Sequence, residues 1–554
     1  MTKTGKKSED AIAQKKSCLL GFAVQSKRSD GSIRVSFRWG RIVALLLVLA
    51  ISGWFVSAGI LYALLHKQGF ETVMFTDTLL FRRDVLRQKM GDDNIQESVS
   101  HIQAGDYGDA FRLLHIGVAR SPGNLEGRKL IAEFYESAMK RPSIAADYLL
   151  IGLEHGGVKD ITYVKVLLQF LLRNQMDKKV QEIAETYLPE EPNLTDINRT
   201  LALGAASAHY QRGNYDQAND YLIAYDLIKS VDGLLISSQI SWERGNRIAA
   251  ITKLERKLNR FPNSEPLLIL LSRYYRTMGT IDKARRYALL RSVKDPSSPK
   301  PKLELLYIYN QSGDHEREAQ GIERMFEQFS DDKAALLEFA NFAAQTGNTD
   351  LAKRIHTVAM ENEFDLDLFA ILWLESHLIS KDYTGALDYS ESLIEAQPHW
   401  LTEKWSLFNG LRSVAAYATK RPDLGEVYLK NFTEDTNHNA QVYLSIANHF
   451  SRIGQISKAR KVLESAYRQI PANQRILSEF IKVELELGHT KNLDELLTRL
   501  LKMRRPPMEL LVKAYQKLGS DRFIFTQNRE TLLFQIGDLL RENNQSLLDR
   551  TATQ

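Results

Sequence analysis

A glycine followed five residues later by a small residue recurs along this chain at a nearly constant interval. The glycines of this pattern are Gly105, Gly213, Gly245, Gly279, Gly313, Gly347, Gly454 and Gly488. Lys381 holds the same place in the segment SKDYTGA. From Gly245 to Lys381 every interval is 34 residues, and the interval from Gly454 to Gly488 is 34 again. A fixed period of this length predicts an array of stacked helix–turn–helix units rather than one compact domain.

Each mark of the pattern has a physical reason. Glycine ends the first helix of a unit because the chain reverses there through a left-handed backbone conformation. The small residue marks a close crossing of the two helices, where a larger side chain would overpack the contact. The small residues are Ala110, Ala218, Ala250, Ala284, Ala352, Ala386 and Ala459. After Gly313 the alanine, Ala319, comes one residue late. Proline cannot continue a helix, so it closes many units. These prolines are Pro122, Pro262, Pro296, Pro398 and Pro471.

Alternating amphipathic segments with short turns extend from about residue 94 to 507, which leaves room for about twelve units of 34 residues. Three units lack most of the marks: 125–157, 158–192 and 401–439. After residue 507 the pattern fades, and we expect 508–554 to form helices that cap the last unit. The predicted fold class is therefore all-α, an α-solenoid behind one N-terminal transmembrane helix.

The transmembrane helix is predicted at 42–66, because Ile42 to Leu65 contains no charged residue. At about 1.5 Å per residue these 24 residues reach about 36 Å, enough to span a bilayer with some tilt. The other interpretations are a buried core helix and a cleaved signal peptide, but the segment LLHKQGF that follows does not resemble a cleavage site. We expect residues 67–93 to form a juxtamembrane helix or linker.

Flanking charge predicts the orientation. Residues 27–41 contain five Lys or Arg residues, whereas 67–81 contain only Lys67. The positive-inside rule then places the N-terminus in the cytoplasm and the solenoid outside it, which in a bacterium is the periplasm. Residues 1–41 become a basic cytoplasmic tail that we expect to be disordered. Arg82, Arg83 and Arg87 lie slightly farther out and favour the opposite topology, which stays open.

Composition excludes several classes of function. The formal net charge is +5, but residues 1–41 alone carry ten basic against three acidic residues, so the remainder is slightly negative. The main body therefore has no basic excess for nucleic acid. The single cysteine, Cys18, excludes an intramolecular disulfide and a cysteine-based zinc site. The sequence contains no HExxH, GxSxG, phosphate-loop or GxGxxG motif, and His438 and His449 lack a third ligand at helical spacing. We expect no enzyme activity, no metal and no cofactor.

The repeat resembles the tetratricopeptide repeat family. The unit 265–298 matches that family at Leu268, Ser272, Tyr275, Ala284 and Pro296, and the unit 440–473 matches almost as well. The resemblance implies a right-handed superhelix whose concave surface binds extended peptides or helices of partner proteins. It also implies which side chains of the middle units face that surface. They are Tyr210, Trp242, Arg273, Arg276, Tyr307, Asn310 and Asn341.

The functional expectation is a membrane-anchored scaffold or adaptor that binds partner proteins through its concave surface, in envelope assembly, secretion or polysaccharide export. Two alternatives remain at the level of the sequence. One is a cytoplasm-facing adaptor that recruits soluble proteins to the membrane. The other is an accessory subunit that contacts glycan, because aromatic side chains in a groove serve either kind of ligand.

Overall fold

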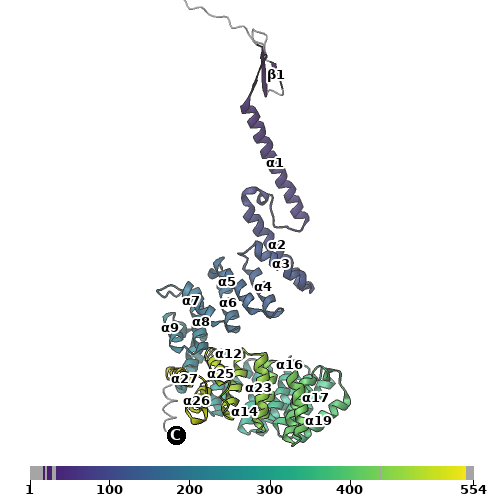
Figure 1. The fold of residues 1–554 in the computed structure, drawn as a ribbon, viewed down its shortest axis with the longest axis vertical. Helices are drawn as coiled ribbons and strands as arrows, with labels where there is room; N and C mark the ends of the chain where they lie inside the picture. The colour runs from purple at the N-terminus through teal and green to yellow at the C-terminus, as the bar shows by residue number, and fades with distance from the viewer. Residues whose placement is uncertain (1–15, 19–21, 28–32, 436–437, 544–554) are drawn as a thin grey trace, which may run out of the picture. The chain divides into compact units, whose positions relative to one another are not determined.

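A computed structural model describes residues 16–18, 22–27, 33–435 and 438–543 (Figure 1). The chain divides into two units, residues 1–170 and 171–554, which are described separately. Apart from three short strands, the regular structure in the described residues is helical. Counted along the chain, the helices from α2 to α25 form twelve successive pairs, and α26 and α27 follow them. The predicted class, an α-solenoid behind one apolar N-terminal helix, is confirmed.

The first unit begins with a small antiparallel sheet of strands β1 (Lys16–Cys18), β2 (Ala23–Lys27) and β3 (Ile33–Phe37), in that order. Lys16 pairs with Gln25, and Ala23 pairs with Phe37. These strands lie in the tail that was expected to be disordered. In β3, Ile33, Val35 and Phe37 alternate with other residues, a period-two pattern of residue types that favour strands. The other residues of the tail up to 32 lie mostly outside the described residues.

Helix α1 (Trp39–Lys67) begins three residues before the charge-free stretch. Its 29 residues correspond to a length of about 43 Å. It is the one described helix that is long and apolar enough to cross a membrane, and almost none of its apolar window is buried within the structure. Only Ala58 and Leu65 are buried.

After α1 the chain turns back along the helix. Residues 70–82, here called the return segment, include the short 3-10 helices η1 (Phe75–Thr78) and η2 (Leu80–Arg82). The N–H of Phe70 donates to the carbonyl of Leu65 at 3.1 Å, and Thr78 Oγ1 donates to the carbonyl of Ala58 at 3.1 Å. The return segment therefore packs against one side of the last three turns of α1, where Phe75 also contacts Tyr62 edge to face.

The rest of the first unit holds two helix pairs, α2 (Arg83–Ala104) with α3 (Tyr107–Arg120) and α4 (Leu125–Ser137) with α5 (Pro142–Glu154). Helices α2 and α3 cross at two glycines, Gly91 and Gly117. A Cβ atom added to Gly91 would lie 2.8 Å from the carbonyl oxygen of Gly117, so the crossing excludes any side chain there. The 3-10 helix η3 (Gly157–Lys159) follows, and α6 (Ile161–Arg173) contains the boundary between the units.

The second unit continues the array of pairs. Its helices are α7 (Asp177–Tyr187), α8 (Asp196–Arg212), α9 (Tyr215–Ala224), α10 (Val231–Glu243), α11 (Arg247–Leu258), α12 (Glu265–Thr277), α13 (Ile281–Lys294), α14 (Pro299–Ser312), α15 (His315–Phe329), α16 (Lys333–Thr346), α17 (Thr349–Glu361), α18 (Asp367–Ile379), α19 (Tyr383–Ala396), α20 (Trp405–Ala418), α21 (Pro422–Glu434), α22 (Ala440–Arg452), α23 (Ile456–Gln469), α24 (Gln474–Leu487), α25 (Leu493–Leu501), α26 (Met508–Gly519) and α27 (Arg529–Asn543). The core runs between the helices, where side chains such as Leu268, Leu271 and Ala288 are fully or almost fully buried. Even-numbered helices are the first of each pair.

The turns inside the pairs behave as the sequence predicted. All eight marked glycines have positive φ, between 68° and 84°, and Lys381 adopts φ of 65° in their place. The three units without marks use the same left-handed turn, but the residue is Lys140, Gln175 or Lys420, with φ of 55° to 60°. These units are therefore ordinary helix pairs, and a long side chain replaces glycine at the turn.

The small residues also lie where the pattern placed them, since all seven marked alanines are buried. Two marked turns lack a small residue at this place: in α24–α25 it is the buried Leu493, and in α14–α15 the alanine was expected one residue late. There Glu318 occupies the buried position five residues after Gly313, and Ala319 is exposed. The Glu318 carboxylate accepts a hydrogen bond from Asn310 Nδ2 at 2.9 Å, which satisfies one of its oxygens at the helix crossing.

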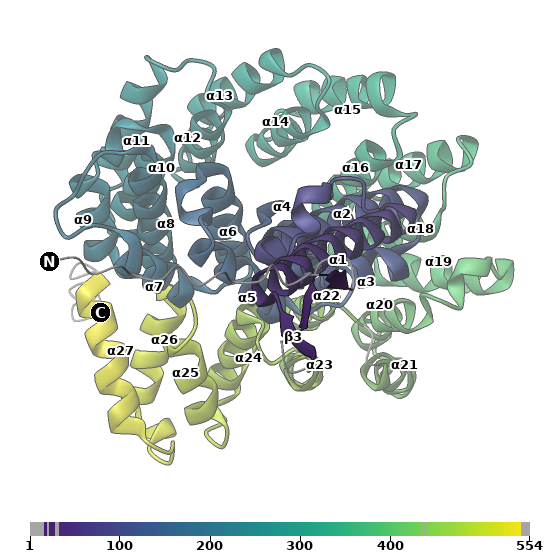
Figure 2. The same ribbon diagram turned by 90° about the horizontal axis from the view of Figure 1, so that it is seen from above.

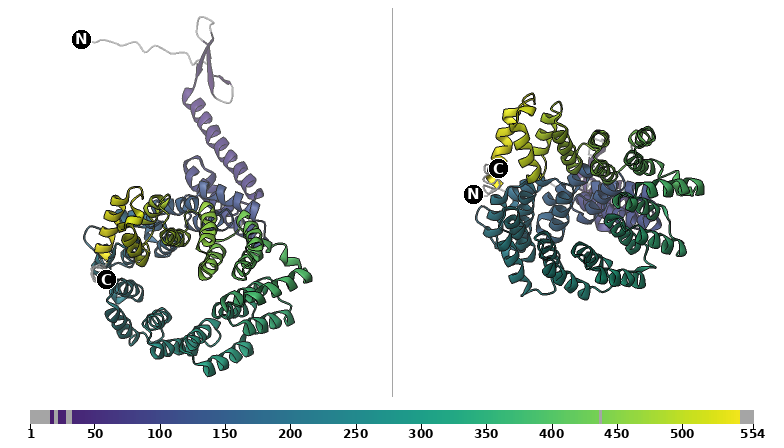
Figure 3. Two further views of the ribbon diagram at one scale, coloured as in Figure 1. Left: turned by 60° about the horizontal axis from the view of Figure 1, so that its bottom comes forward. Right: turned by 90° about the horizontal axis from the view of Figure 1, so that it is seen from below.

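The second unit closes on itself (Figures 2 and 3). Residues 502–505, which connect α25 to α26, contact α8 and the region around the start of α7. Arg504 binds Asp177 through two nitrogens, at 2.8 and 2.5 Å, and also the carbonyl of Leu172. The N–H of Arg505 donates to the carbonyl of Gln211 at 2.7 Å, and Arg212 donates to the carbonyl of Lys502 at 2.9 Å. We call these contacts the seam. They join parts of the chain about 300 residues apart and make the second unit a closed ring of helix pairs.

Candidate functional site

Three neighbouring cavities follow one face of the helix array, and we call them together the inner groove. The first, of about 410 Å³, lies between α8, α10 and α12; the second, of about 460 Å³, between α12, α14 and α16; the third, of about 780 Å³, between α16, α18, α20 and α22. Arg273 lines both the first and the second, and Asn341 lines both the second and the third. Except for Arg505, all lining residues come from the first helices of their pairs.

Six of the seven predicted groove residues line these cavities. Tyr210, Trp242, Arg273, Arg276, Tyr307 and Asn341 do so. Asn310 does not, although it has the same position in its helix as Trp242 and Arg276. Its amide is instead engaged by Glu318, the carboxylate that replaces the small residue at the α14–α15 crossing. The placement of the six is a fact of the structure, whereas their role in binding stays a prediction.

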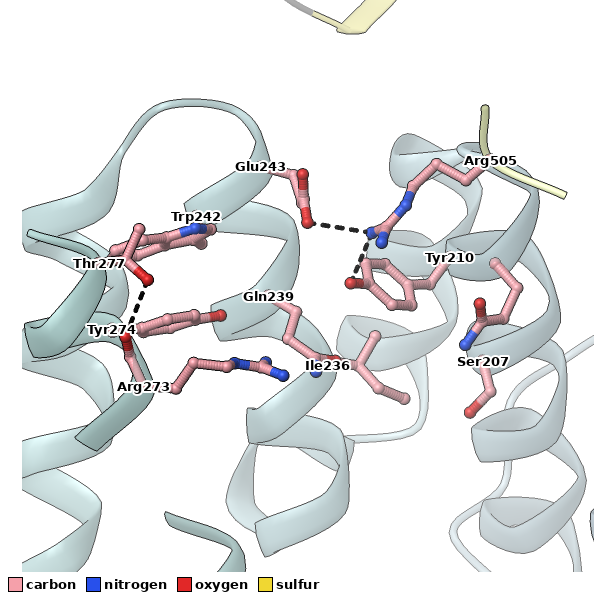
Figure 4. A pocket seen from close by; sticks show the side chains of 11 residues that line it. Ser207, Tyr210, Ile236, Gln239, Trp242, Glu243, Arg273, Tyr274, Thr277 and Arg505 are labelled. Atoms are coloured by element: carbon pink, nitrogen blue, oxygen red, sulfur yellow. Dashed lines mark hydrogen bonds and ion pairs between the residues drawn. The ribbon is translucent and has the colours of Figure 1, made fainter. Parts of the chain in front are cut away.

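An aromatic stack forms one wall of the first cavity (Figure 4). The rings of Trp242 and Tyr274 are parallel within 5°, with centroids 3.8 Å apart. The Arg247 guanidinium lies 5.2 Å from the Trp242 centroid, and that of Arg273 lies 5.8 Å from the Tyr274 centroid. Trp242 is thus held in place by its neighbours and presents a preformed surface. Tyr274, which is buried, did not figure in the sequence prediction.

Arg505 forms the opposite wall and comes from the seam, not from a first helix (Figure 4). One of its nitrogens donates to the Tyr210 hydroxyl at 2.6 Å and lies 3.3 Å from a carboxylate oxygen of Glu243. Burial raises the pKa of Tyr210, and the guanidinium of Arg505 opposes this shift. Sequence reasoning missed Arg505 because nothing local links residue 505 to residue 210. Its one local signal is its place in the sequence RRPP, residues 504–507, after which the repeat pattern fades.

Two arginines at the junction of the first two cavities lack an ion-pair partner in the part of the chain that the structure describes, although Glu304 and Glu338 also line the second cavity. Among the described residues, neither Arg273 nor Arg276 forms an ion pair. Burial raises the pKa of the Tyr307 hydroxyl, and the nearby Arg276 guanidinium opposes this shift. Arg505, by contrast, is occupied by Glu243. The two arginines lie three residues apart on α12, so they share one helix face. This part of the groove can accept negative charge beside a flat aromatic surface.

Comparison with known proteins adds little beyond the fold. No protein-family model matches the chain, and no curated protein matches it. A solved structure of Naa15/Naa10 bound to HypK-THB shares 15% identity, covers 89% of this chain and 76% of that chain, and has a TM-score of 0.30. A tetratricopeptide repeat protein from Parabacteroides merdae shares 13% identity, with 45% and 96% coverage and a TM-score of 0.27. The TPR domain of P58(IPK) shares 15% identity, with 72% and 99% coverage and a TM-score of 0.20.

At these TM-scores the solved structures carry no argument about this chain. The geometry of the chain itself supports the resemblance. Its helix pairs follow a period of about 34 residues, each pair has a left-handed turn, and most have a buried small residue five positions after that turn. The chain is similar to the tetratricopeptide repeat proteins. The coarse function that such a helical repeat indicates is protein–protein interaction.

The third cavity contains a partly buried polar cluster. The carboxylate of Glu375, on α18, accepts a hydrogen bond from Ser445 Oγ at 2.6 Å and lies 3.1 Å from His449 Nε2, both on α22. Burial alone would raise the pKa of Glu375, but the contacts with His449 and Ser445 lower it below its usual value. The serine hydroxyl donates to the carboxylate and not to the imidazole, so the cluster lacks the serine–histidine hydrogen bond of a catalytic triad. His449, which was interpreted as a lone histidine, therefore has a partner on another repeat.

One group of side chains among the described residues has the spacing of metal ligands: His101, Asp106 and Asp109. Each already has a structural role. Asp106 caps α3 and lies 3.2 Å from His101 Nδ1, and Asp109 pairs with Arg112. Asp106 and Asp109 are exposed. We assign no metal to this group.

Proposed function

We propose that the protein is a membrane-anchored scaffold that holds an extended segment of a partner protein along the inner groove. One observation carries the proposal: two arginines that form no ion pair with any described residue, Arg273 and Arg276, lie beside a preformed aromatic wall. A segment that combines an acidic side chain with an aromatic or planar group is complementary to this surface. Asn341, farther along the groove, can hydrogen-bond to the backbone of an extended chain.

The anchoring part of the proposal rests on α1, and the orientation rests on flanking charge. We propose that the solenoid lies outside the cytoplasm, where it serves an envelope assembly, secretion or polysaccharide-export machine. A reporter that is active only outside the cytoplasm, fused after Gln554, is expected to be active. Activity of a cytoplasmic reporter alone would replace this proposal with that of an adaptor that recruits soluble proteins to the membrane.

The role of the inner groove in binding is tested by reversing the charge of Arg273 and Arg276. In the full-length protein, Arg273→Glu combined with Arg276→Glu is expected to abolish cross-linked capture of the partner from detergent extracts. The matched control is Arg256→Glu combined with Arg286→Glu, which makes the same change of charge at exposed positions on the second helices α11 and α13. Circular dichroism and gel filtration check that both variants are folded. Normal capture by the folded Arg273/Arg276 variant would show that the partner binds elsewhere.

A further inference from the structure

The charge-free stretch of α1 is longer than a bilayer needs, and the structure divides it into two parts. The hydrocarbon core of a bilayer is about 30 Å thick, whereas α1 is about 43 Å long. In the first part, side chains such as Leu46, Leu47 and Val48 are exposed and no described residue outside α1 packs on them, whereas in the second part Ile60 and Leu64 are exposed only on the side away from the return segment. From Trp54 to Leu65 the return segment packs along the helix.

The return segment places a charged side chain, that of Asp77, beside the turn of α1 that contains Ala58. Thr78 contacts Ala58, and its neighbour Asp77 is buried and pairs with Lys89 at 2.6 Å and Arg82 at 3.4 Å. Exposed Arg82 and Arg83 follow directly. Charged side chains at the centre of a bilayer cost several kcal/mol, so this level of the helix does not lie in the hydrocarbon core. A span that uses all of Ile42 to Leu65 would place these charges inside the core.

Two tryptophans mark boundaries that agree with this division. Trp39 begins α1 and is exposed, and Trp54 lies where the return segment ends. Tryptophan prefers the two interfaces of a membrane. The stretch from Trp39 to Ser57 corresponds to about 28 Å, close to the thickness of one hydrocarbon core, and Arg41 lies near enough to its first end to reach the headgroups. The ten residues from Ala58 to Lys67 would then cross the headgroup region and emerge from it.

The end of the return segment presents apolar groups at this boundary. Phe81 is 88% exposed and its ring lies 5.5 Å from that of Trp54, edge to face. Met74 is 63% exposed, and Phe75 stacks against Phe55 at 6.4 Å. An exposed aromatic side chain followed by two arginines fits an interface, with the ring among the upper acyl chains and the guanidinium groups at the phosphates.

We propose that the return segment is a second membrane-contact element, which binds the lipid interface at the C-terminal end of the span through Phe81, Arg82 and Arg83. The proposal rests on the anchoring of α1 in a bilayer proposed above. It moves the edge of the hydrocarbon core from Leu65 to about Ser57. The partner of this surface is the phospholipid itself, because the surface continues the lipid-facing side of α1 at Trp54.

The test measures depth in the full-length protein, reconstituted in phosphatidylcholine vesicles. Cys18 is replaced by serine, and single cysteines labelled with NBD are introduced at Leu47, Ile60 or Phe81, whose side chains are all exposed. Lipids brominated near the chain ends are expected to quench the label at Leu47 most. Lipids brominated near the glycerol are expected to quench the label at Phe81 most. The label at Ile60 is expected to be quenched less by either lipid than the label at Phe81.

The outcomes separate this inference from the anchoring itself. If the label at Leu47 is not quenched, the anchoring is wrong. If Leu47 is quenched but Phe81 is not, or if the lipids brominated at the chain ends quench Ile60 as strongly as Leu47, the division of α1 is wrong. Phe525→Cys, at an aromatic residue of the second unit that is 89% exposed, gives the unquenched reference. If Phe81→Cys does not fold, Met74→Cys replaces it, with weaker quenching by the same shallow lipids expected and its absence contradicting the proposal.

Discussion

Arg504→Ala is expected to open the ring of the second unit. The Asp177 carboxylate is fully buried and receives two hydrogen bonds from Arg504, while Arg212 Nε lies 3.3 Å away as its second partner. Removal of one partner of a buried ion pair costs about 3–5 kcal/mol, because it leaves a buried charge uncompensated. Since Arg212 remains as a partner of Asp177, we expect the lower end of this range, a loss of about 3 kcal/mol from the free energy that holds the seam closed.

The seam is monitored directly by distance. Spin labels at Asp216→Cys on α9 and Lys517→Cys on α26, with Cys18 replaced by serine, lie on the two sides of the seam. The parent protein should show one narrow distance distribution by electron–electron double resonance, and Arg504→Ala should broaden it toward longer distances. Urea denaturation of the same proteins should show an earlier first transition for the variant. Arg504→Lys keeps the charge but loses the two-pronged contact, so an intermediate effect is expected.

A surface ion pair provides the control. Arg541 and Asp538 lie 3.2 Å apart with exposed side chains, so Arg541→Ala should change stability by less than about 1 kcal/mol and leave the spin-label distance unchanged. An Arg504→Ala protein with the parent's distance distribution and the parent's denaturation curve would refute the assignment of Arg504 as the closing contact.

Three further predictions concern the repeats. Ala284→Leu fills a fully buried helix crossing and should destabilise the protein by about 1–3 kcal/mol in chemical denaturation, with an unchanged curve contradicting the predicted crossing. Lys381→Gly should stabilise by up to about 1 kcal/mol, because φ of 65° strains a lysine but not a glycine; a loss of stability would mean that the side chain has a packing role. Glu426 hydrogen-bonds to Lys458 and Lys461, which lower its pKa to about 2, so its contribution to stability is complete above about pH 4.5 and is lost as the pH falls toward 2. Glu426→Gln should lack this part of the acid dependence in denaturation midpoints measured between pH 5 and 2.

The repeat could be predicted from sequence because its two determinants are local. A left-handed turn favours glycine wherever it occurs, and a close crossing favours alanine. The unit boundaries could not be predicted sharply where residues other than glycine and alanine occupy the turn or the crossing. Lys140, Gln175 and Lys420 adopt the left-handed turn at a cost that the packed helices outweigh. Glu318 occupies a crossing where its carboxylate is hydrogen-bonded, which no rule based on side-chain size anticipates.

The candidate site was predictable only in part, for the same reason. Six groove residues followed from the resemblance to the tetratricopeptide repeat family, which implies the positions of a unit that face the concave surface, and a regular helix repeats that face in every unit. Arg505 depends on how the curvature of many successive pairs accumulates until residues 505 and 210 meet, and no local pattern encodes that sum. The division of α1 was also invisible, because residues 42–65 read as one apolar stretch until Thr78 is seen against Ala58.

The seam also restricts how this chain can vary in length. An open helical array can gain or lose a repeat at modest cost, because each unit contacts only its neighbours along the chain. In a closed ring, removal of one 34-residue unit changes both the angle and the rise between the first and last pairs. Asp177 and Arg504 would then no longer face each other. The number of repeats between them is therefore set by geometric closure, as the number of strands is in a barrel, and tolerated insertions should fall in loops and not add whole units.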